Sequence, residues 1–173
     1  MCGRFYISDD TVREIEKTIR LVDENLKMER RNKDIHPTEN APVISYQQGS
    51  MFLADKEWGF PGFDSGKVIF NARSESVLEK KMFRGSVLKR RLIIPAAGFY
   101  EWNRKKEKVT FTSAVKEQPI LYMAGFYNKY GNEDRFVILT TGANDSMADV
   151  PERMPLLLKR QELEDWLRDD RRL

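Results

Sequence analysis

The stretch RLIIPAAGFYEW, residues 91–102, decides the expected fold. It is apolar and rich in β-branched and aromatic residues, a composition that is enriched in β-strands. Three further stretches share this composition and also predict strands: KVTFTS (108–113), PILYMAGFY (119–127) and RFVILTT (135–141). Because turns rather than long helices separate most of these stretches, we expect a largely antiparallel or mixed sheet.

Helical patterns flank these strands. Ser8 can cap a helix over residues 9–29, in which Val12, Ile15, Ile19 and later apolar residues recur at the three- and four-residue spacing of one buried face. Residues 42–46 and 51–55 predict a hairpin, 76–90 a broken helical stretch, and 161–169 a short closing helix. We therefore predict an α+β architecture, a barrel-like sheet with flanking helices, in one domain over residues 1–173.

The composition excludes several classes of protein. Hydrophobic residues make up 40% of the 173 residues, which indicates a globular chain. No apolar run is long enough for a membrane span, and the N-terminus lacks a signal-peptide core. One cysteine and one histidine, His36, are too few for a disulfide framework or a zinc site. We expect a cytoplasmic protein without metal or cofactor, and a monomer is the default expectation.

Positive charge is concentrated in one part of the chain. Residues 66–108 contain twelve Lys or Arg and four Glu, a net charge of +8 in a chain whose total is +3. Such a local excess favours a phosphate backbone as partner, and aromatic residues among the cations are typical of single-strand binding sites. The alternatives are a solvated charged surface, above all at residues 103–108, and aromatic side chains that belong to the core.

The single cysteine is the second residue, in MCGRF (1–5). Removal of Met1 would leave the α-amine and the thiol on the same residue, and both groups are partly deprotonated near neutral pH. A 1,2-aminothiol of this kind condenses with an aldehyde to an imine and closes to a thiazolidine. The simpler interpretation is that Cys2 is an inert, small apolar residue at the start of a strand.

Two other places carry candidate chemistry. Asn71, Arg73 and Glu75 would alternate onto one face if the strand at residues 67–70 continues through them. Glu101 lies within an apolar strand, where burial would raise its pKa and suit it to proton transfer near neutral pH. For the first group the alternative is a capping Asn beside two exposed charges, and for Glu101 it is a buried pair with an arginine.

Several motifs occur together in the order and spacing of a known family. They are MCGRF (1–5), NARSES (71–76), RLIIPAAGFYEW (91–102) and TTGAND…ERMPLLL (140–158), with weaker matches at IHPTENAP (35–42) and WGF (58–60). In these motifs the chain resembles the SOS response-associated peptidase (SRAP) family over essentially its whole length. The resemblance implies a protein that binds abasic sites in single-stranded DNA and protects them during the SOS response to DNA damage. It implies a covalent thiazolidine crosslink through Cys2 after loss of Met1. Removal of Met1 is either autocatalytic or carried out by a housekeeping enzyme. It also implies a peptidase or lyase of the hydrolase type, and association with the nucleoid when the protein is bound to DNA.

The resemblance also implies roles for single residues. Cys2 is similar to the nucleophile, Asn71 to the asparagine that orients the reacting groups, and Glu101 to the glutamate that transfers protons. The remaining matches are to residues that contact DNA: phosphate-binding arginines at Arg4 and Arg73, an apolar wedge at Trp58 and Phe60, and a threonine lining the site at Thr140.

This sequence departs from the family pattern at three places. The family histidine two residues before the arginine of RMP is Pro151 here. We hypothesise that His36, Glu152 or a water supplies the proton transfer instead, or that proton transfers during formation and release of the crosslink are slower. The loop WGFPGF is one residue shorter than in the family. Asp34 replaces a loop asparagine, and we hypothesise that its carboxylate pairs with the α-amine of Cys2.

Two alternative functions remain from the sequence. An N-terminal nucleophile amidohydrolase of the class II glutamine amidotransferase type also begins Met-Cys-Gly, with the α-amine as base for its own thiolate. The other alternative is a non-covalent single-strand binder in which Cys2 is structural.

Overall fold

The computed structural model describes residues 2–19, 32–64, 66–102, 105, 107–113, 118–143 and 153–168. Within these residues the strands are β1 (Phe5–Ile7), β2 (Lys33–Ile35), β3 (Asn40–Gln47), β4 (Ser50–Trp58), β5 (Phe60–Pro61), β6 (Val68–Ile69), β7 (Asn71–Arg73), β8 (Arg91–Ala96), β9 (Gly98–Trp102), β10 (Lys108–Thr112), β11 (Leu121–Tyr130), β12 (Glu133–Gly142), β13 (Arg153–Pro155) and β14 (Leu157–Leu158). The helices are α1 (Asp9–Thr18), α2 (Lys81–Lys89) and α3 (Leu163–Arg168), with 3₁₀ turns at Ser74–Ser76 and Arg160–Glu162.

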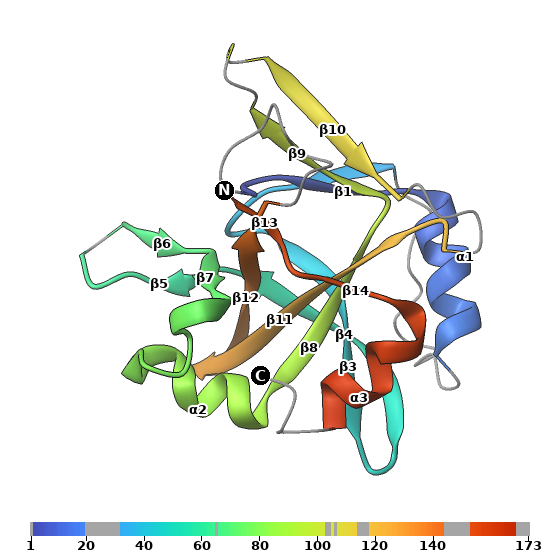
Figure 1. Cartoon of the computed structure of the whole chain (residues 1–173). Coiled ribbons are helices and arrows are strands. Elements are labelled where there is room, and N and C mark those ends of the chain that lie inside the picture. Colours follow the sequence, from blue (N-terminus) through green and yellow to red (C-terminus); the bar gives the residue numbers. More distant parts are fainter. Residues whose placement is uncertain are drawn as a thin grey trace.

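Five strands close into a barrel. Their order around the ring is β12-β4-β3-β8-β11, and β11 pairs again with β12. All neighbours are antiparallel except β12 and β4, which run parallel. Figure 1 shows the helices outside this ring, with α1 and α3 on one side and α2 at the lower end. The predicted α+β fold with a mixed, barrel-like sheet is confirmed.

A second sheet, in the order β10-β9-β1-β2, lies across one end of the barrel (Figure 1). The stretch 91–102 connects the two sheets, because its first half is β8 of the barrel and its second half is β9 of the second sheet. The backbone bends at Ala97, between the two strands. At Gly98, the first residue of β9, a Cβ atom would stand 2.5 Å from the Phe111 carbonyl oxygen and 2.6 Å from the Tyr6 ring. Only glycine allows the strands to approach this closely.

The apolar side chains form two clusters. One includes residues from α1, α2 and α3 together with alternate residues of the barrel strands, so it lies between the helices and the outside of the barrel. The other contains strand residues without helical ones, among them Leu92, Ile94 and Ile138 of the barrel. Cys2, Phe5 and Phe99 of the second sheet join this second cluster, which places the N-terminal segment over the barrel interior.

The helices are shorter than the sequence predicted. Ser8 caps α1 through a capping box with Thr11, as expected, and the described part of this helix ends at Thr18. The rest of the predicted helix, residues 20–29, falls outside the described residues. None of the described helices combines the length and apolar character needed to cross a membrane.

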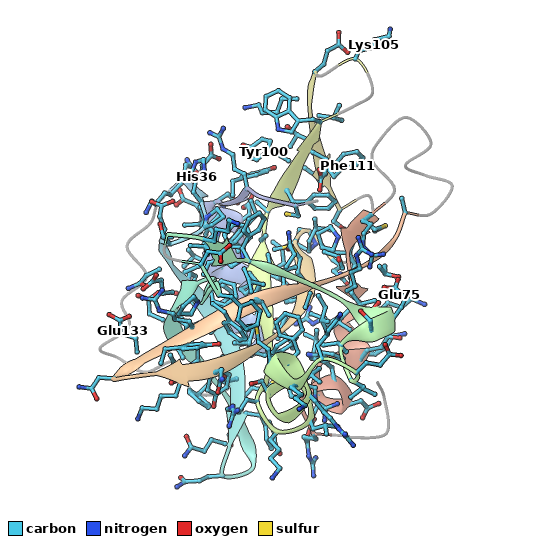
Figure 2. The ribbon with its side chains drawn as sticks, turned by 90° about the vertical axis from the view of Figure 1, so that its left-hand side faces the viewer. His36, Glu75, Tyr100, Lys105, Phe111 and Glu133 are labelled. Carbon is cyan, nitrogen blue, oxygen red and sulfur yellow. The ribbon has the colours of Figure 1, made fainter. Side chains whose placement is uncertain are left out.

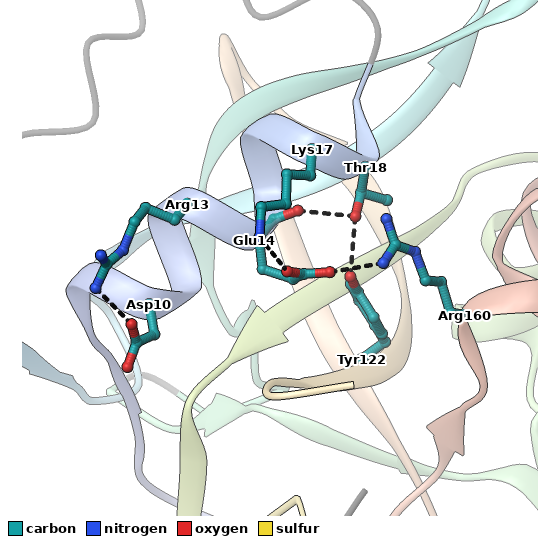
Figure 3. Close-up of polar contacts among 7 residues, drawn as sticks. All are labelled: Asp10, Arg13, Glu14, Lys17, Thr18, Tyr122 and Arg160. Atoms are coloured by element: carbon teal, nitrogen blue, oxygen red, sulfur yellow. Dashed lines mark hydrogen bonds and ion pairs between the residues drawn. The ribbon is translucent and has the colours of Figure 1, made fainter. Parts of the chain in front are cut away.

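One buried carboxylate ties α1 to the C-terminal segment. Glu14 is 4% exposed, and its carboxylate lies 2.8 Å from Arg160 and 3.6 Å from Lys17 (Figure 3). Beside it, the Thr18 hydroxyl donates to the Glu14 backbone carbonyl and lies 3.0 Å from the Tyr122 hydroxyl of β11. The charge of Glu14 is thus compensated from two elements that are far apart in the sequence.

We predict that Arg160→Gln lowers the free energy of unfolding by about 2 kcal/mol, because it leaves the buried Glu14 carboxylate with Lys17 as its remaining partner. Urea unfolding measures the change. The double variant Glu14→Gln/Arg160→Gln removes the buried charge as well and should recover part of the loss. A single variant as stable as the original chain would show that Arg160 contributes nothing here.

Candidate functional site

Cys2 lies three residues before β1, over the interior of the barrel, and is completely buried. The Asn71 side-chain amide donates a hydrogen bond of 2.8 Å to the Cys2 backbone carbonyl. The thiol itself makes a weak contact of 3.7 Å with the Arg4 carbonyl oxygen. The first residues of the chain are therefore held from two directions, by the sheet and by Asn71.

Glu101 is placed beside this segment by the pairing of β9 with β1. Phe5 is opposite Phe99, and the Tyr100 amide donates to the Arg4 carbonyl, so Glu101 comes opposite Gly3. Like Phe99, it points to the inner face of the sheet, where it is 2% exposed. Burial raises the pKa of the Glu101 carboxyl above its ordinary value.

The environment of Cys2 opposes formation of the thiolate. In the chain that retains Met1, burial first and the charge of Glu101 second raise the pKa of the Cys2 thiol to about 12. A thiol with this pKa is protonated near neutral pH, so it is not an activated nucleophile by itself. It needs a partner that takes its proton, and Glu101 is the carboxylate whose charge acts on it.

The three predicted catalytic residues thus come together from three distant segments. Asn71 reaches Cys2 because β7 adds to the barrel edge parallel to β12, with Asn71 opposite Ile138. Its side-chain oxygen is buried and accepts no hydrogen bond from the described residues. A buried oxygen in this state can accept a hydrogen bond from a group that enters the site.

Asp34 has different partners from those we hypothesised. Its carboxylate forms an ion pair with Arg4 and accepts a hydrogen bond of 3.0 Å from the Tyr100 hydroxyl. Burial would raise its pKa, but the hydrogen bonds from Tyr100 and Arg4 lower it below the ordinary value. The Arg4 guanidinium also stacks 5.1 Å from the Tyr100 ring centroid. Arg4 is thus held on the outer face of the second sheet, and a phosphate there would compete with Asp34.

Arg153, at the start of β13, is a site residue that the sequence reasoning missed. Its guanidinium donates to the Thr140 hydroxyl at 3.2 Å, to the Thr140 carbonyl at 2.7 Å, and to the Glu75 carboxylate at 2.8 Å. Thr140 is fully buried, so it positions Arg153 rather than facing a ligand. The RMP triplet at 153–155 was the available signal for this arginine.

The strand predicted through Asn71, Arg73 and Glu75 ends earlier than we expected. β7 stops at Arg73, and Glu75 lies in the 3₁₀ turn Ser74–Ser76, where Arg153 lowers its pKa. Arg73 is exposed and forms no ion pair with another described residue. It lies opposite Thr140 in the β7–β12 pairing, so Arg73 and Arg153 border the same edge of the barrel.

The predicted wedge residues occupy the core. Trp58 and Phe60 are both completely buried, and the Trp58 indole donates a hydrogen bond of 2.9 Å to the Phe70 carbonyl. Their side chains therefore have no surface with which to contact DNA in this structure. The exposed aromatic residue of the same segment is Phe63, between β5 and β6, which is 88% exposed. All three aromatic residues lie in the same apolar segment, so the sequence pattern did not show which of their side chains is at the surface.

The compensating residues proposed for the missing family histidine are only partly placed. His36 is exposed directly after β2, and its backbone amide donates to Glu39 at 2.7 Å. Figure 2 shows His36 and Glu75 on opposite sides of the molecule, so His36 is distant from the Glu75–Arg153 pair. Glu152 and Pro151 lie outside the described residues. Among the described residues, no group of His, Cys, Asp or Glu side chains is arranged to hold a metal ion.

The fold and site define a class of protein: an α+β barrel with a cysteine at position 2, held beside a buried glutamate and an asparagine. The chain belongs to the SOS response associated peptidase (SRAP) family, whose sequence model matches residues 1–172.

Individual relatives agree with this assignment. The abasic site processing protein YoaM of Bacillus subtilis is 31% identical over 146 residues, which are 78% of this chain and 64% of YoaM. YoqW of the same organism is 29% identical over 96% of this chain and 80% of its own length, and YedK of Escherichia coli is 26% identical over 98% and 81%. A solved structure from Bordetella bronchiseptica superimposes with a TM-score of 0.77 at 25% identity, covering 97% of this chain and 89% of its own. One from Bacteroides thetaiotaomicron, at 23% identity and the same TM-score, shares the fold over 96% of this chain and 81% of its own.

We predict that the Cys2 thiol of the folded chain, with Met1 retained, reacts with iodoacetamide about a thousandfold more slowly at pH 8 than the thiol of the unfolded chain. The reason is that the pKa of the thiol rises from 9.0 to about 12 on folding, and the thiolate is the reactive form. The rate should keep rising with pH well above 9. Glu101→Gln should shift the profile to lower pH, because it removes the like charge. Equal rates in the folded and unfolded chains would contradict this description of the site.

Proposed function

We propose that this protein captures abasic sites in single-stranded DNA by a covalent crosslink through Cys2 and so protects the lesion. One observation carries the proposal: Asn71 holds the Cys2 carbonyl at 2.8 Å while the charge of the buried Glu101 acts on the Cys2 thiol. A structural cysteine would need neither partner. That relatives are named abasic site processing proteins supports a lesion of this kind as the substrate.

The reaction begins once Met1 is removed and Cys2 carries a free α-amine. The amine nitrogen attacks the aldehyde carbon of the ring-opened sugar, and the resulting carbinolamine loses water to form an imine. The thiol sulfur then adds to the imine carbon, its proton passes to the nitrogen through the site, and the five-membered thiazolidine closes. One water leaves in total, and no oxidant or cofactor takes part.

Glu101 serves both proton transfers of this sequence. Its raised pKa keeps a fraction of the carboxyl protonated closer to neutral pH, so it can protonate the departing hydroxyl of the carbinolamine. The carboxylate that results takes the proton of the thiol as the carbon–sulfur bond forms. Asn71 orients Cys2 through the carbonyl and has its side-chain oxygen available to the α-amine or to a sugar hydroxyl.

The DNA contacts follow from which cations are exposed. Arg73 is exposed at the barrel edge, and Arg153 beside it is 17% exposed and oriented by Thr140 and Glu75. We assign both to phosphates that flank the lesion. Phe63 and Trp102, which is 59% exposed, are the aromatic surfaces on which neighbouring bases can stack. Arg4 joins these contacts only when a phosphate displaces Asp34 from it.

This function requires cleavage of one peptide bond, Met1–Cys2, and we assign no broader peptidase activity. Membership of the SRAP family leaves the amidohydrolase alternative without support. The remaining alternative is a non-covalent single-strand binder. Such a protein would bind the same DNA, but its own mass would not increase by that of the DNA. A role in the SOS response and a location on damaged DNA in the cytoplasm belong to the same proposal.

We predict that protein beginning at Cys2 gains the mass of an abasic oligonucleotide minus one water, as measured by intact-mass spectrometry. Cys2→Ala should give no stable adduct, and Glu101→Gln should slow adduct formation by roughly a hundredfold or more. The rate should rise with pH as the α-amine loses its proton and fall as Glu101 loses its own. The falling limb should disappear in Glu101→Gln.

Asn71→Leu is the matched variant for position, since its side chain is similar in size and uncharged but lacks the donor to Cys2. It should slow the adduct while leaving the pH dependence in place. Protein confirmed to start at Cys2 that forms no adduct would overturn the capture mechanism and leave the non-covalent binder.

We predict that Phe63→Ala weakens binding of undamaged single-stranded DNA roughly tenfold, because one stacked base contributes about 1–3 kcal/mol. Fluorescence anisotropy measures the change, and Phe63→Tyr should bind like the original chain because it keeps the ring. Since Phe63 is 88% exposed, its thermal unfolding midpoint should not move. Unchanged binding in Phe63→Ala would remove this residue from the DNA path.

A further inference from the structure

A second positively charged surface lies on α2, and the chemistry proposed above does not use it. We define the α2 cationic face as Lys80, Lys81, Arg84 and Lys89, which are all exposed. No acidic residue occurs between Lys80 and Arg91. None of the four forms an ion pair with another residue in the described ranges. Other exposed cations differ in this respect. Arg13, Lys67 and Arg168 are each compensated by a nearby carboxylate. Lys105, Lys108 and Lys129 form no ion pair with a described residue, but they do not share one helix face.

The opposite side of α2 is firmly attached to the barrel, so the cationic face has a fixed orientation. Ser86 and Val87 are buried, and the Phe83 ring packs 5.5 Å from the ring centroid of Phe126 in β11. Lys81 and Lys89 are eight residues apart, about 12 Å along the helix axis. The face is therefore a rigid row of charges at the end of the barrel where α2 lies in Figure 1.

Gly85 occupies the middle of this row. It is four residues from both Lys81 and Lys89, and a Cβ atom added there would meet no other described atom within 4 Å. An exposed glycine inside a helix destabilises it relative to alanine, and here alanine would fit without any clash. Packing within the chain therefore does not require this glycine. Because Gly85 has no side chain, the helix backbone is accessible between the cationic side chains, and a polyanion can approach it closely there.

Two of the charges, Lys80 and Lys81, are also placed against the preference of the helix, whereas Lys89 in the last turn is favourably placed. Lys80 is the N-cap and provides no side-chain cap, and the first turn contains no acidic residue. Cations near a helix N-terminus are unfavourable because they add to the positive end of the helix dipole. Together with Gly85, these are three departures from a stable helix on one face, and such departures indicate function when nothing in the fold compensates them.

We propose that the α2 cationic face binds the phosphate backbone of the DNA on which the protein acts, at a place separate from the crosslinking site. This inference rests on the proposed function for the identity of the polyanion. The row of point charges without aromatic side chains fits sequence-independent phosphate contact rather than base recognition. It supplies affinity for undamaged DNA near a lesion, and the chemistry at Cys2 does not depend on it.

The test uses undamaged single-stranded DNA and protein beginning at Cys2. Binding is measured over a series of salt concentrations for Lys81→Gln/Arg84→Gln/Lys89→Gln and for a control of equal charge loss, Lys17→Gln/Lys129→Gln/Lys159→Gln. The face variant should bind more weakly, and its slope of log affinity against log salt should be smaller by about 2, because up to three phosphate contacts of roughly 0.7 each are lost. The control should keep the original slope. Equal slopes in the two variants would overturn the proposal.

The variant Gly85→Ala distinguishes an effect on DNA contact from an effect on the stability of the fold. It should raise the thermal unfolding midpoint while it weakens DNA binding, since the added methyl stabilises the helix and blocks close approach. Higher stability with unchanged binding would show that the glycine serves no contact. Vesicles of anionic lipid complete the test: binding to them that depends on the face, with DNA binding that does not, would also overturn the proposal.

Failure of this inference is distinguishable from failure of the proposed function. At saturating protein the face variant should still form the Cys2 adduct with an abasic oligonucleotide, and Cys2→Ala should keep the salt slope of the original chain. An adduct without a face effect overturns the α2 assignment alone. A face effect without an adduct overturns the crosslink alone.

Discussion

The structure depends on the hydrogen bonding of β1 along both of its edges. A chain terminus usually frays unless it is tied down. Here Phe5 pairs with Ile35 of β2 on one side and with Phe99 of β9 on the other, and Asn71 adds a bond to the Cys2 carbonyl. The beginning of the chain is therefore an internal strand. Its register determines what faces Cys2, since a slip of one residue would turn Glu101 to the outer face of the sheet.

This register buries the Glu101 carboxyl on the inner face of the sheet, where its charge opposes folding but its raised pKa suits it to proton transfer. A carboxylate buried among Phe5, Phe99 and the barrel residues is desolvated, which raises its pKa and keeps the thiol beside it protonated. Neither group is reactive in the way that an exposed cysteine or glutamate would be. They become effective as a pair, because the Glu101 carboxylate can accept the proton that the Cys2 thiol must lose. The raised pKa protects the lone thiol from general alkylation. In the reaction we propose, the thiol then reacts with an aldehyde that the α-amine already holds.

The sequence predicted the α+β class and the main strands of the barrel, because long apolar stretches determine these features. The resemblance to the SRAP family named Cys2, Asn71 and Glu101 as catalytic residues, and the structure places the three close together. Prediction from the sequence failed where a local pattern admits two tertiary outcomes. Trp58, Phe60 and Phe63 are alike in sequence, yet hydrogen bonding and ring packing bury the first two and leave Phe63 on the surface. Asp34 could not be assigned to Arg4 and Tyr100 without the pairing of β1 with β2 and β9. Arg153 was overlooked because its function depends on Thr140 and Glu75, which the barrel edge brings to it.

The distribution of ion pairs separates chemistry from affinity. At the site two arginines are already engaged, Arg4 with Asp34 and Arg153 with Glu75, so a phosphate that binds either of them must replace an existing partner. Arg73 is the site arginine without an ion-pair partner among the described residues. An arginine that is already paired favours a phosphate in one position, because replacing its carboxylate is favourable only there. Such arginines contribute little to binding of DNA in other positions. The cations of α2 have no such competitor among the described residues, and they attract any phosphate backbone through counterion release. Under the proposed function the protein searches undamaged DNA and reacts with a rare aldehyde. It would then use both kinds of charge, with the α2 cations kept apart from the crosslinking site. If the uncompensated charges surrounded Cys2, they would hold undamaged strands over the thiol and obstruct the lesion.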